Sequence, residues 1–282
     1  MTNYLRTTDL ARAADVHPNT VRRYVQQGLL PPVERSANGY RRFTQGHLDC
    51  LRVARIVHMD TYPGRAFRQS ANVILRRALV DDWAGALHRA QAHLAFVRAE
   101  RAQAEAAAEL LEQWAMDAAG ATDEDEPAGQ PLRIGQAAHL LGISIDMLRN
   151  WERNGLIAIP RDAENRYRTY QPADISRLRI IRLLSRVGYS QMAILRMMLQ
   201  LDRGETSDLR RALDTPRGDE DVYTAADHWL STLATQEGVA RRLLSVVEEI
   251  GARAAEAPGP APTLTFSNPP LGHQGYTLMV SR

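Results

Sequence analysis

The 282-residue sequence contains no lysine and a single cysteine, Cys50. One thiol excludes an internal disulfide framework and any zinc or iron–sulfur site built from several thiolates. No apolar run approaches the roughly 20 residues that a membrane-spanning helix needs, and the N-terminal residues do not form the apolar stretch of a signal peptide. A Gly-rich phosphate loop, a metal cluster and a nucleophile motif are absent too. We therefore expect a cytoplasmic protein, not a membrane protein or an enzyme, that needs no cofactor.

The charge of the chain is divided unevenly along its length. All 35 basic residues are arginine, and the formal net charge is only +2. Residues 1–70 contain 11 arginines and 5 acidic residues, and residues 132–201 contain the same numbers, whereas the remainder is strongly acidic. Two compact basic segments on an acidic frame are typical of a protein that binds a polyanion through two surfaces.

The two basic segments are copies of one another. Sliding the sequence along itself gives a constant offset of 127 residues, which holds without a gap for almost 60 residues. Matched pairs include Leu5-Arg6 with Leu132-Arg133, Arg22 with Arg149, Gly28 with Gly155, Tyr40-Arg41 with Tyr167-Arg168, and Tyr62 with Tyr189. Glycines, charges and aromatics in one register indicate a duplication.

Each copy has the pattern of a helix-turn-helix followed by a hairpin. Residues 7–14 form a short apolar-faced helix, and a second helix runs from Pro18 to about Gln27, where Gly28 ends it. In the second copy Ser144 is the expected N-cap and Gly155 ends the helix. A basic and aromatic return strand follows at 40–43 or 167–170, and a third helix begins near 45 or 172. We expect Asn38-Gly39 to form the first hairpin turn, with both residues accepting positive φ.

These motifs resemble the head of the MerR family. The first copy carries them as Thr20-Val-Arg-Arg-Tyr24, Gly28-Leu-Leu30 and Asn38-Gly-Tyr-Arg-Arg-Phe43; the second as Met147-Leu-Arg-Asn-Trp-Glu152, Gly155-Leu-Ile157 and Tyr167-Arg-Thr-Tyr170. Gly188-Tyr-Ser190 resembles the next turn of the family, where the first copy departs with Thr61-Tyr-Pro-Gly64. The resemblance covers about half of the chain. It implies a mainly α fold with two winged helix-turn-helix domains that bind double-stranded DNA.

The resemblance also implies which residues contact DNA. Residues at the N-terminus of the second helix would face base edges, while arginines and the wing would contact phosphates. Tyr24 and Trp151 have two interpretations, a backbone contact or packing of the wing against the helix. The full set is His17, Asn19, Thr20, Arg22, Arg23, Tyr24, Asn38, Tyr40, Arg41, Arg42 and Tyr62, with Ser144, Asp146, Met147, Arg149, Asn150, Trp151, Asn165, Tyr167, Arg168 and Tyr189.

Two stretches outside the heads have the heptad pattern of long paired helices. They run from about Ala84 to Met116 and from Asp227 to Arg253, and each apolar seam contains one charged residue, Arg101 or Glu237. In the resembled family one such helix per subunit pairs antiparallel with its twin. Because both lie on this chain, we expect an intramolecular pseudodimer with an antiparallel coiled coil. The expected register places Ala90 beside Gly251.

In that register Arg101 and Glu237 lie one layer apart. They are expected either to form an ion pair or to extend separately into solvent.

The expected organisation is a first head (1–70), a connection and long helix (71–117), an acidic linker (118–131), a second head (132–201), a connection and long helix (202–254) and a Pro/Gly-rich tail (255–282). Cys50 is expected to be a buried thiol rather than a sensor, and Trp83, Trp114 and Trp229 to pack in the core rather than to line an effector pocket.

The leading functional hypothesis is a sequence-specific transcription regulator associated with the nucleoid when bound. The resemblance implies that it bends and untwists a promoter at an imperfect palindrome, with RNA polymerase holoenzyme as a partner. An architectural or recombination-directing DNA-bending protein is the alternative. A regulator that senses a small molecule at the long helices is a third.

Overall fold

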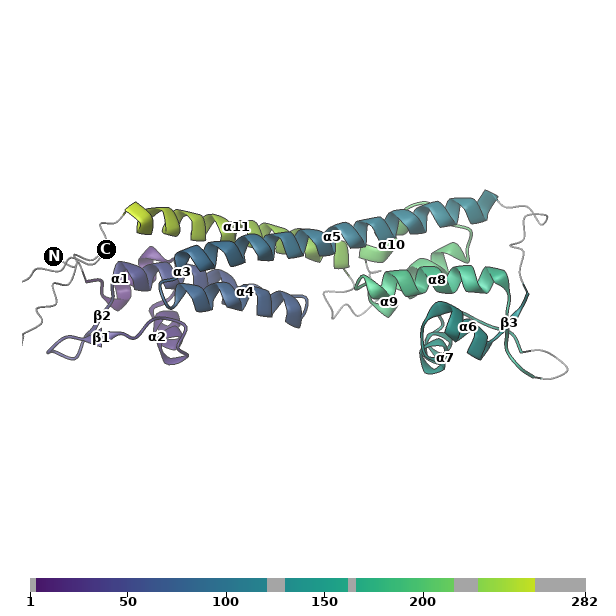
Figure 1. Cartoon of the computed structure of the whole chain (residues 1–282), viewed down its shortest axis with the longest axis horizontal. Coiled ribbons are helices and arrows are strands. Elements are labelled where there is room, and N and C mark those ends of the chain that lie inside the picture. Colours follow the sequence, from purple (N-terminus) through teal and green to yellow (C-terminus); the bar gives the residue numbers. More distant parts are fainter. Residues whose placement is uncertain (1–3, 121–129, 162–165, 216–227, 257–282) are drawn as a thin grey trace, which may run out of the picture.

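The computed structural model describes residues 4–120, 130–161, 166–215 and 228–256. It is mainly helical, and two long helices form a beam that carries one head near each end (Figure 1). None of the helices in these ranges is long and apolar enough to cross a membrane. The expected acidic linker and Pro/Gly-rich tail lie mostly outside the described residues.

The first head contains helices α1 (Thr7–Ala13) and α2 (Pro18–Gln26), which form the predicted helix-turn-helix. Gly28 follows α2 with φ +68°, the left-handed conformation that ends a helix. Strands β1 (Glu34–Arg35) and β2 (Arg41–Arg42) pair antiparallel as the wing. Helices α3 (Gln45–Met59) and α4 (Arg65–Ala78) complete the head. Its core includes Leu10, Val21, Phe43 and Leu51.

The second head repeats this order. It contains α6 (Ile134–Leu141), α7 (Ile145–Arg153), α8 (Pro172–Arg186) and α9 (Gln191–Leu201). Strands β3 (Leu132–Arg133) and β4 (Thr169–Tyr170) pair Leu132 with Tyr170, and the first head pairs Leu5 with Phe43 at the equivalent positions. Both heads have a fourth helix, α4 or α9. Residues Thr61–Gly64, where the first copy departs from the family pattern, therefore do not prevent α4 from forming. The duplication seen in the sequence is therefore a duplication of structure.

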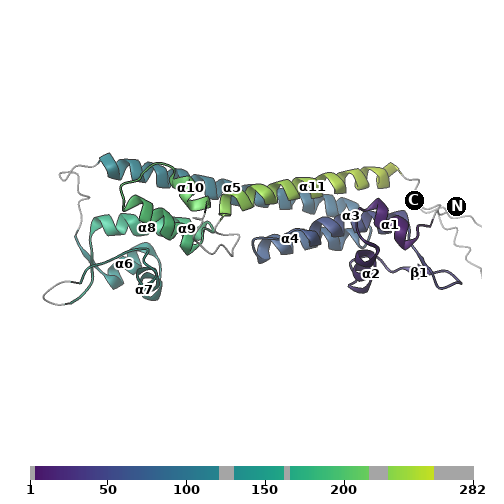
Figure 2. The same ribbon diagram turned by 180° about the vertical axis from the view of Figure 1, so that it is seen from behind.

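The two long helices run antiparallel and connect the heads. Helix α5 (Trp83–Gly120) packs on α4 of the first head and reaches α8 of the second. Helix α11 (Trp229–Glu256) runs back along α5 and packs on α3 of the first head, while the short α10 (Leu209–Asp214) contacts α5, α9 and α11. Figure 2 shows the same pairing from behind. Helix α5, which follows the first head in the chain, thus also contacts the second head. Helix α11, which follows the second head, contacts the first.

Trp229, the first residue of α11, contacts both heads near the middle of the α5–α11 pair. Its indole N–H donates to the carbonyl of Val187 in the second head, at 2.6 Å. Its ring meets the edge of Phe67 of the first head, with ring centroids 6.3 Å apart. A Cβ on Gly188 would lie 2.6 Å from the same indole, so only glycine fits there. Trp83 and Trp229 are buried, as the sequence predicted.

A buried carboxylate marks the α5–α11 seam. Only 7% of the Glu237 side chain is exposed, and its oxygens accept hydrogen bonds from Arg98 at 2.9 Å and from Arg101 at 3.0 Å. Arg241, one turn along α11, approaches to 2.6 Å. These arginines, Arg98 first, hold the pKa of Glu237 below its ordinary value. The predicted Arg101–Glu237 ion pair is confirmed, and Arg98 and Arg241 join it.

The predicted register of the seam was wrong. The nearest atom to a Cβ built on Gly251 is the Cβ of Trp83, at 4.0 Å, whereas we expected Ala90. The difference is seven residues, one heptad, which preserves the apolar pattern and so could not be detected from that pattern. The ion pair still forms because an arginine side chain is long enough to reach across the shift.

The seam generates a prediction about stability. In a double-mutant cycle of Arg101→Ala and Glu237→Ala, we expect a coupling of up to about 1 kcal/mol, because Arg101 is part-exposed and Arg98 and Arg241 still compensate Glu237. Denaturant unfolding measures it. A matched cycle of Arg89→Ala with Glu237→Ala should be additive, since exposed Arg89 has no bond to Glu237. Additivity in both cycles would contradict the pairing.

Candidate nucleic-acid interface

Helices α2 and α7, called here the recognition helices, lie on the same side of the molecule. In both views they face away from the beam formed by α5 and α11, one under each head (Figures 1 and 2). Each follows a short helix through a tight turn. Each is too short to be stable in isolation and is held by apolar residues of its inner face, Val21 or Leu148, which are buried in the head. The outer faces are left exposed to solvent.

The first recognition helix is basic and carries no acidic residue. His17 caps it, because its Nδ1 accepts from the backbone N–H of Asn19 at 3.2 Å. The exposed Arg22 donates to the side-chain oxygen of Asn19 at 2.9 Å, which holds the guanidinium at the N-terminal end of the helix. Arg23 lies 5.8 Å from the centre of the Tyr24 ring. Two arginines are thereby held on the outer face at full charge.

The wing of the first head extends this basic surface. Tyr40 is 75% exposed at the tip, and Arg42 stacks 4.0 Å over the ring of Tyr4. Arg41 lies in the wing strand, and its side chain has no hydrogen bond or ion pair to another residue in the described ranges. In the turn Gly39 has a positive φ, +77°, whereas Asn38, which also tolerates that conformation, does not adopt it. The backbone N–H of Gly39 donates to Ser36, which closes the turn one residue earlier.

The second recognition helix has a different charge pattern. Ser144 caps it as predicted, with its hydroxyl accepting from the N–H of Met147 at 3.1 Å. Arg149 pairs with Asp146 at 3.2 Å, and Arg168 of the wing pairs with Glu152 at 2.5 Å. Glu152 was missed by our sequence reasoning as a functional residue. The signal was present, because Glu152 stands opposite Val25 at the 127-residue offset.

Four aromatic residues of the candidate contact set are buried in the core. Tyr24 and Trp151 are each 2% exposed, so their rings pack inside the heads, one of the two interpretations that the sequence left open. Tyr62 is buried as well, which raises its pKa to about 12. Tyr189 donates its hydroxyl to the carbonyl of Ala104 on α5 at 3.2 Å. Tyr189 therefore links the second head to α5.

The other expected contact residues lie on the recognition helices or the wings. Met147 is 44% exposed at the N-terminus of α7, Tyr167 is 60% exposed in the second wing, and Thr20 and Asn150 are half-buried. Ile145, 38% exposed beside Met147, is an apolar surface residue that we did not predict. Asn165 lies outside the described residues.

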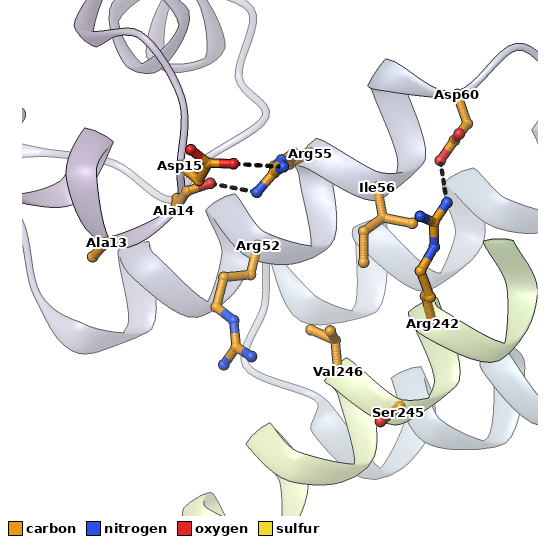
Figure 3. Close-up of a pocket in the computed structure, with 10 residues that line it drawn as sticks. All are labelled: Ala13, Ala14, Asp15, Arg52, Arg55, Ile56, Asp60, Arg242, Ser245 and Val246. Atoms are coloured by element: carbon orange, nitrogen blue, oxygen red, sulfur yellow. Dashed lines mark hydrogen bonds and ion pairs between the residues drawn. The ribbon is translucent and has the colours of Figure 1, made fainter.

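A groove of about 670 Å³ separates the first head from α11 (Figure 3). The arginines that line it each form an ion pair with an acidic residue. Arg55 donates to the carbonyl of Ala14 at 2.8 Å and pairs with Asp15 at 3.1 Å, and Arg242 reaches Asp60 at 3.8 Å. Arg52 forms two hydrogen bonds to Glu249 of α11, at 2.8 and 2.6 Å. The Arg52–Glu249 and Arg242–Asp60 pairs attach the head to α11.

Cys50 is buried, as the sequence predicted. Its thiol donates to the carbonyl of Ala78 at 3.3 Å, and burial raises its pKa to about 12, so the thiol stays protonated. Over the ranges that the structure describes, no group of three or more histidine, cysteine, aspartate or glutamate residues is placed to hold a metal ion. The thiol is a packing residue of α3.

Comparison with known proteins gives matches in both heads. Residues 132–201 match the model of the MerR HTH family regulatory protein, and residues 6–43 match that of the MerR family regulatory protein. Similar curated proteins are a "Heavy metal-dependent transcription regulator 2" of Rhizobium meliloti, 37% identical over 59 residues, and a "Mercuric resistance operon regulatory protein" of Bacillus cereus, 34% identical over 58 residues. A "Probable heavy metal-dependent transcriptional regulator" of Haemophilus influenzae is 37% identical over 59 residues. No solved structure matches the chain significantly.

The fold and these matches agree on one class of protein, helix-turn-helix regulators with a wing. The chain carries two segments that match MerR family models, one in each half. The matched segments are 21% of this chain and 40%, 44% and 46% of the Rhizobium, Bacillus and Haemophilus proteins, so less than half of each relative is covered.

Proposed function

We propose that the protein is a transcription regulator that binds double-stranded DNA through both heads of one chain. The observation that carries the proposal is the display of α2 and α7 on one face of a single beam, each with arginines on its outer side. A helix of this kind fits the major groove of DNA, and the adjacent wing reaches the backbone. The likeness to curated transcription regulators supports the same conclusion.

One chain supplies both reading surfaces, so the two half-sites need not be the same. A homodimer presents an identical helix twice and selects a symmetric site. Here the helix starts read His17-Pro-Asn-Thr20 and Ser144-Ile-Asp-Met147. The proposed operator is therefore an imperfect palindrome. At a promoter, binding bends and untwists the DNA between the heads, and RNA polymerase holoenzyme reads the changed shape.

An architectural DNA-bending protein would have the same heads. Footprinting on a bound promoter with and without RNA polymerase separates the two functions. A regulator changes the polymerase footprint at the −10 element, whereas an architectural protein leaves it unchanged. We favour the regulator because the curated relatives are named as regulators.

Heavy-metal sensing, named for two of the relatives, is not part of the proposal. The single cysteine is buried and hydrogen-bonded to a backbone carbonyl. Sensing of a small molecule has a weak basis too, because the arginines of the groove beside α11 are engaged by Asp15, Asp60 and Glu249.

Selection of bound sites from random duplex DNA tests the proposal. We expect a two-part site whose half-sites prefer different bases, since residues 17–20 and 144–147 differ. Exchanging residues 144–147 for His-Pro-Asn-Thr should convert the second half-site towards the first and make the palindrome more symmetric. A perfect inverted repeat from the natural chain would contradict the use of two different heads.

Arg41→Ala should weaken binding to every duplex sequence by a similar factor. If Arg41 neutralises one phosphate, the slope of log affinity against log salt becomes shallower by about 0.9. Fluorescence anisotropy at several salt concentrations measures this slope. Arg89→Ala, on exposed α5 surface, is the matched control and should leave the slope unchanged. A loss limited to one sequence with an unchanged slope would assign Arg41 to base reading instead.

A further inference from the structure

The DNA-facing surfaces of the heads differ at several positions, and two of these differences place a carboxylate on α7 where α2 has none. At the 127-residue offset, Asn19 of the first head corresponds to Asp146 of the second, and Val25 corresponds to Glu152. The arginines beside them are the same in both copies, Arg22 with Arg149 and Arg41 with Arg168. The second head therefore has two carboxylates where the first has a neutral amide and an apolar side chain.

In the first head neither of these arginines is paired with a carboxylate in the described ranges. Arg22 donates to the Asn19 amide oxygen, which is neutral, at 2.9 Å. This bond orients the guanidinium without cancelling its charge. The side chain of Arg41 has no acidic partner within the described ranges. DNA phosphates that approach this head meet two arginines without an acidic partner. Each phosphate that an arginine neutralises releases a counterion from the DNA.

In the second head both arginines have a carboxylate partner. Arg168 of the wing bonds to Glu152 of α7 at 2.5 Å, and the two side chains are only 28% and 17% exposed. A charge-assisted bond that is partly shielded from water is stronger than one on the open surface. A phosphate has to compete with Glu152 for this guanidinium. Arg149 pairs with Asp146 at 3.2 Å, where 88% of the Asp146 side chain is exposed, so that pair acts mainly by cancelling charge.

We propose that the two heads bind DNA unequally, the first head supplying most of the salt-dependent phosphate binding and the second being restrained by Asp146 and Glu152. This inference rests on the proposed function, because it divides the DNA binding of that function between the heads. The first head anchors the chain on duplex DNA of any sequence. The second head adds its contacts once its half-site is in reach, and it depends less on counterion release.

The test removes the two carboxylates from the full-length chain. Asp146→Asn with Glu152→Gln keeps the size of each side chain and frees Arg149 and Arg168. Anisotropy with a random-sequence duplex should show a salt slope steeper by up to about 1.8, so that affinity falls about tenfold more between about 50 and about 200 mM salt than for the natural chain. The reciprocal change, Asn19→Asp with Val25→Glu, should make the slope shallower by a similar amount.

A control separates a local effect from a change in net charge. Asp117→Asn with Glu248→Gln removes the same two charges from exposed positions on α5 and α11, and it should leave the slope within half a unit of the natural value. Circular dichroism confirms that each variant is folded.

An unchanged slope in the Asp146→Asn, Glu152→Gln variant would overturn the inequality of the heads. So would an equal change in the control. A natural chain that does not bind duplex DNA at any salt concentration would overturn the proposed function itself, and the inequality with it.

Discussion

The architecture depends on the antiparallel contact between α5 and α11. Helix α5 leaves the first head and ends over the second, while α11 returns to pack on α3 of the first. Neither helix could bury its apolar face alone, and the packing of that face is the main source of helix stability in proteins. Glu237, buried among Arg98, Arg101 and Arg241, favours one alignment because a slip would separate it from Arg98 and Arg101 of α5 and leave only Arg241 beside it. Trp229 then closes the centre by contacting both heads. The positions of α2 and α7 follow from this one contact.

Tethering both heads to one beam removes the symmetry that a homodimer imposes. In a homodimer any substitution in the recognition helix appears at both half-sites. Here Val25 and Glu152 occupy equivalent positions and differ in charge, as do Asn19 and Asp146. Changes that weaken phosphate binding in one head leave the other unaffected. The chain is therefore able to combine one head that binds DNA strongly with a second head of lower charge.

Much of the fold was predictable because its signals are local or repeated. Pro18 begins α2 and Gly28 follows its end, Ser144 caps α7, and the offset of 127 residues revealed the second head. The heptads indicated the pairing of α5 and α11 but not its register, because a shift of one heptad preserves the apolar seam; Gly251 meets Trp83 instead of Ala90. The candidate site was predicted less well. Aromatic residues suit both a core and a DNA backbone, so burial of Tyr24, Trp151 and Tyr189 could be learned only from the packing.

The central claim is that a single chain places two different heads on one DNA site. The most direct test is the mass of the complex between the full-length chain and a duplex that carries one selected site, measured by native mass spectrometry alongside a footprint of the same sample. We expect one chain per duplex with both half-sites protected. Two chains per duplex, or protection of one half-site by one chain, would contradict it.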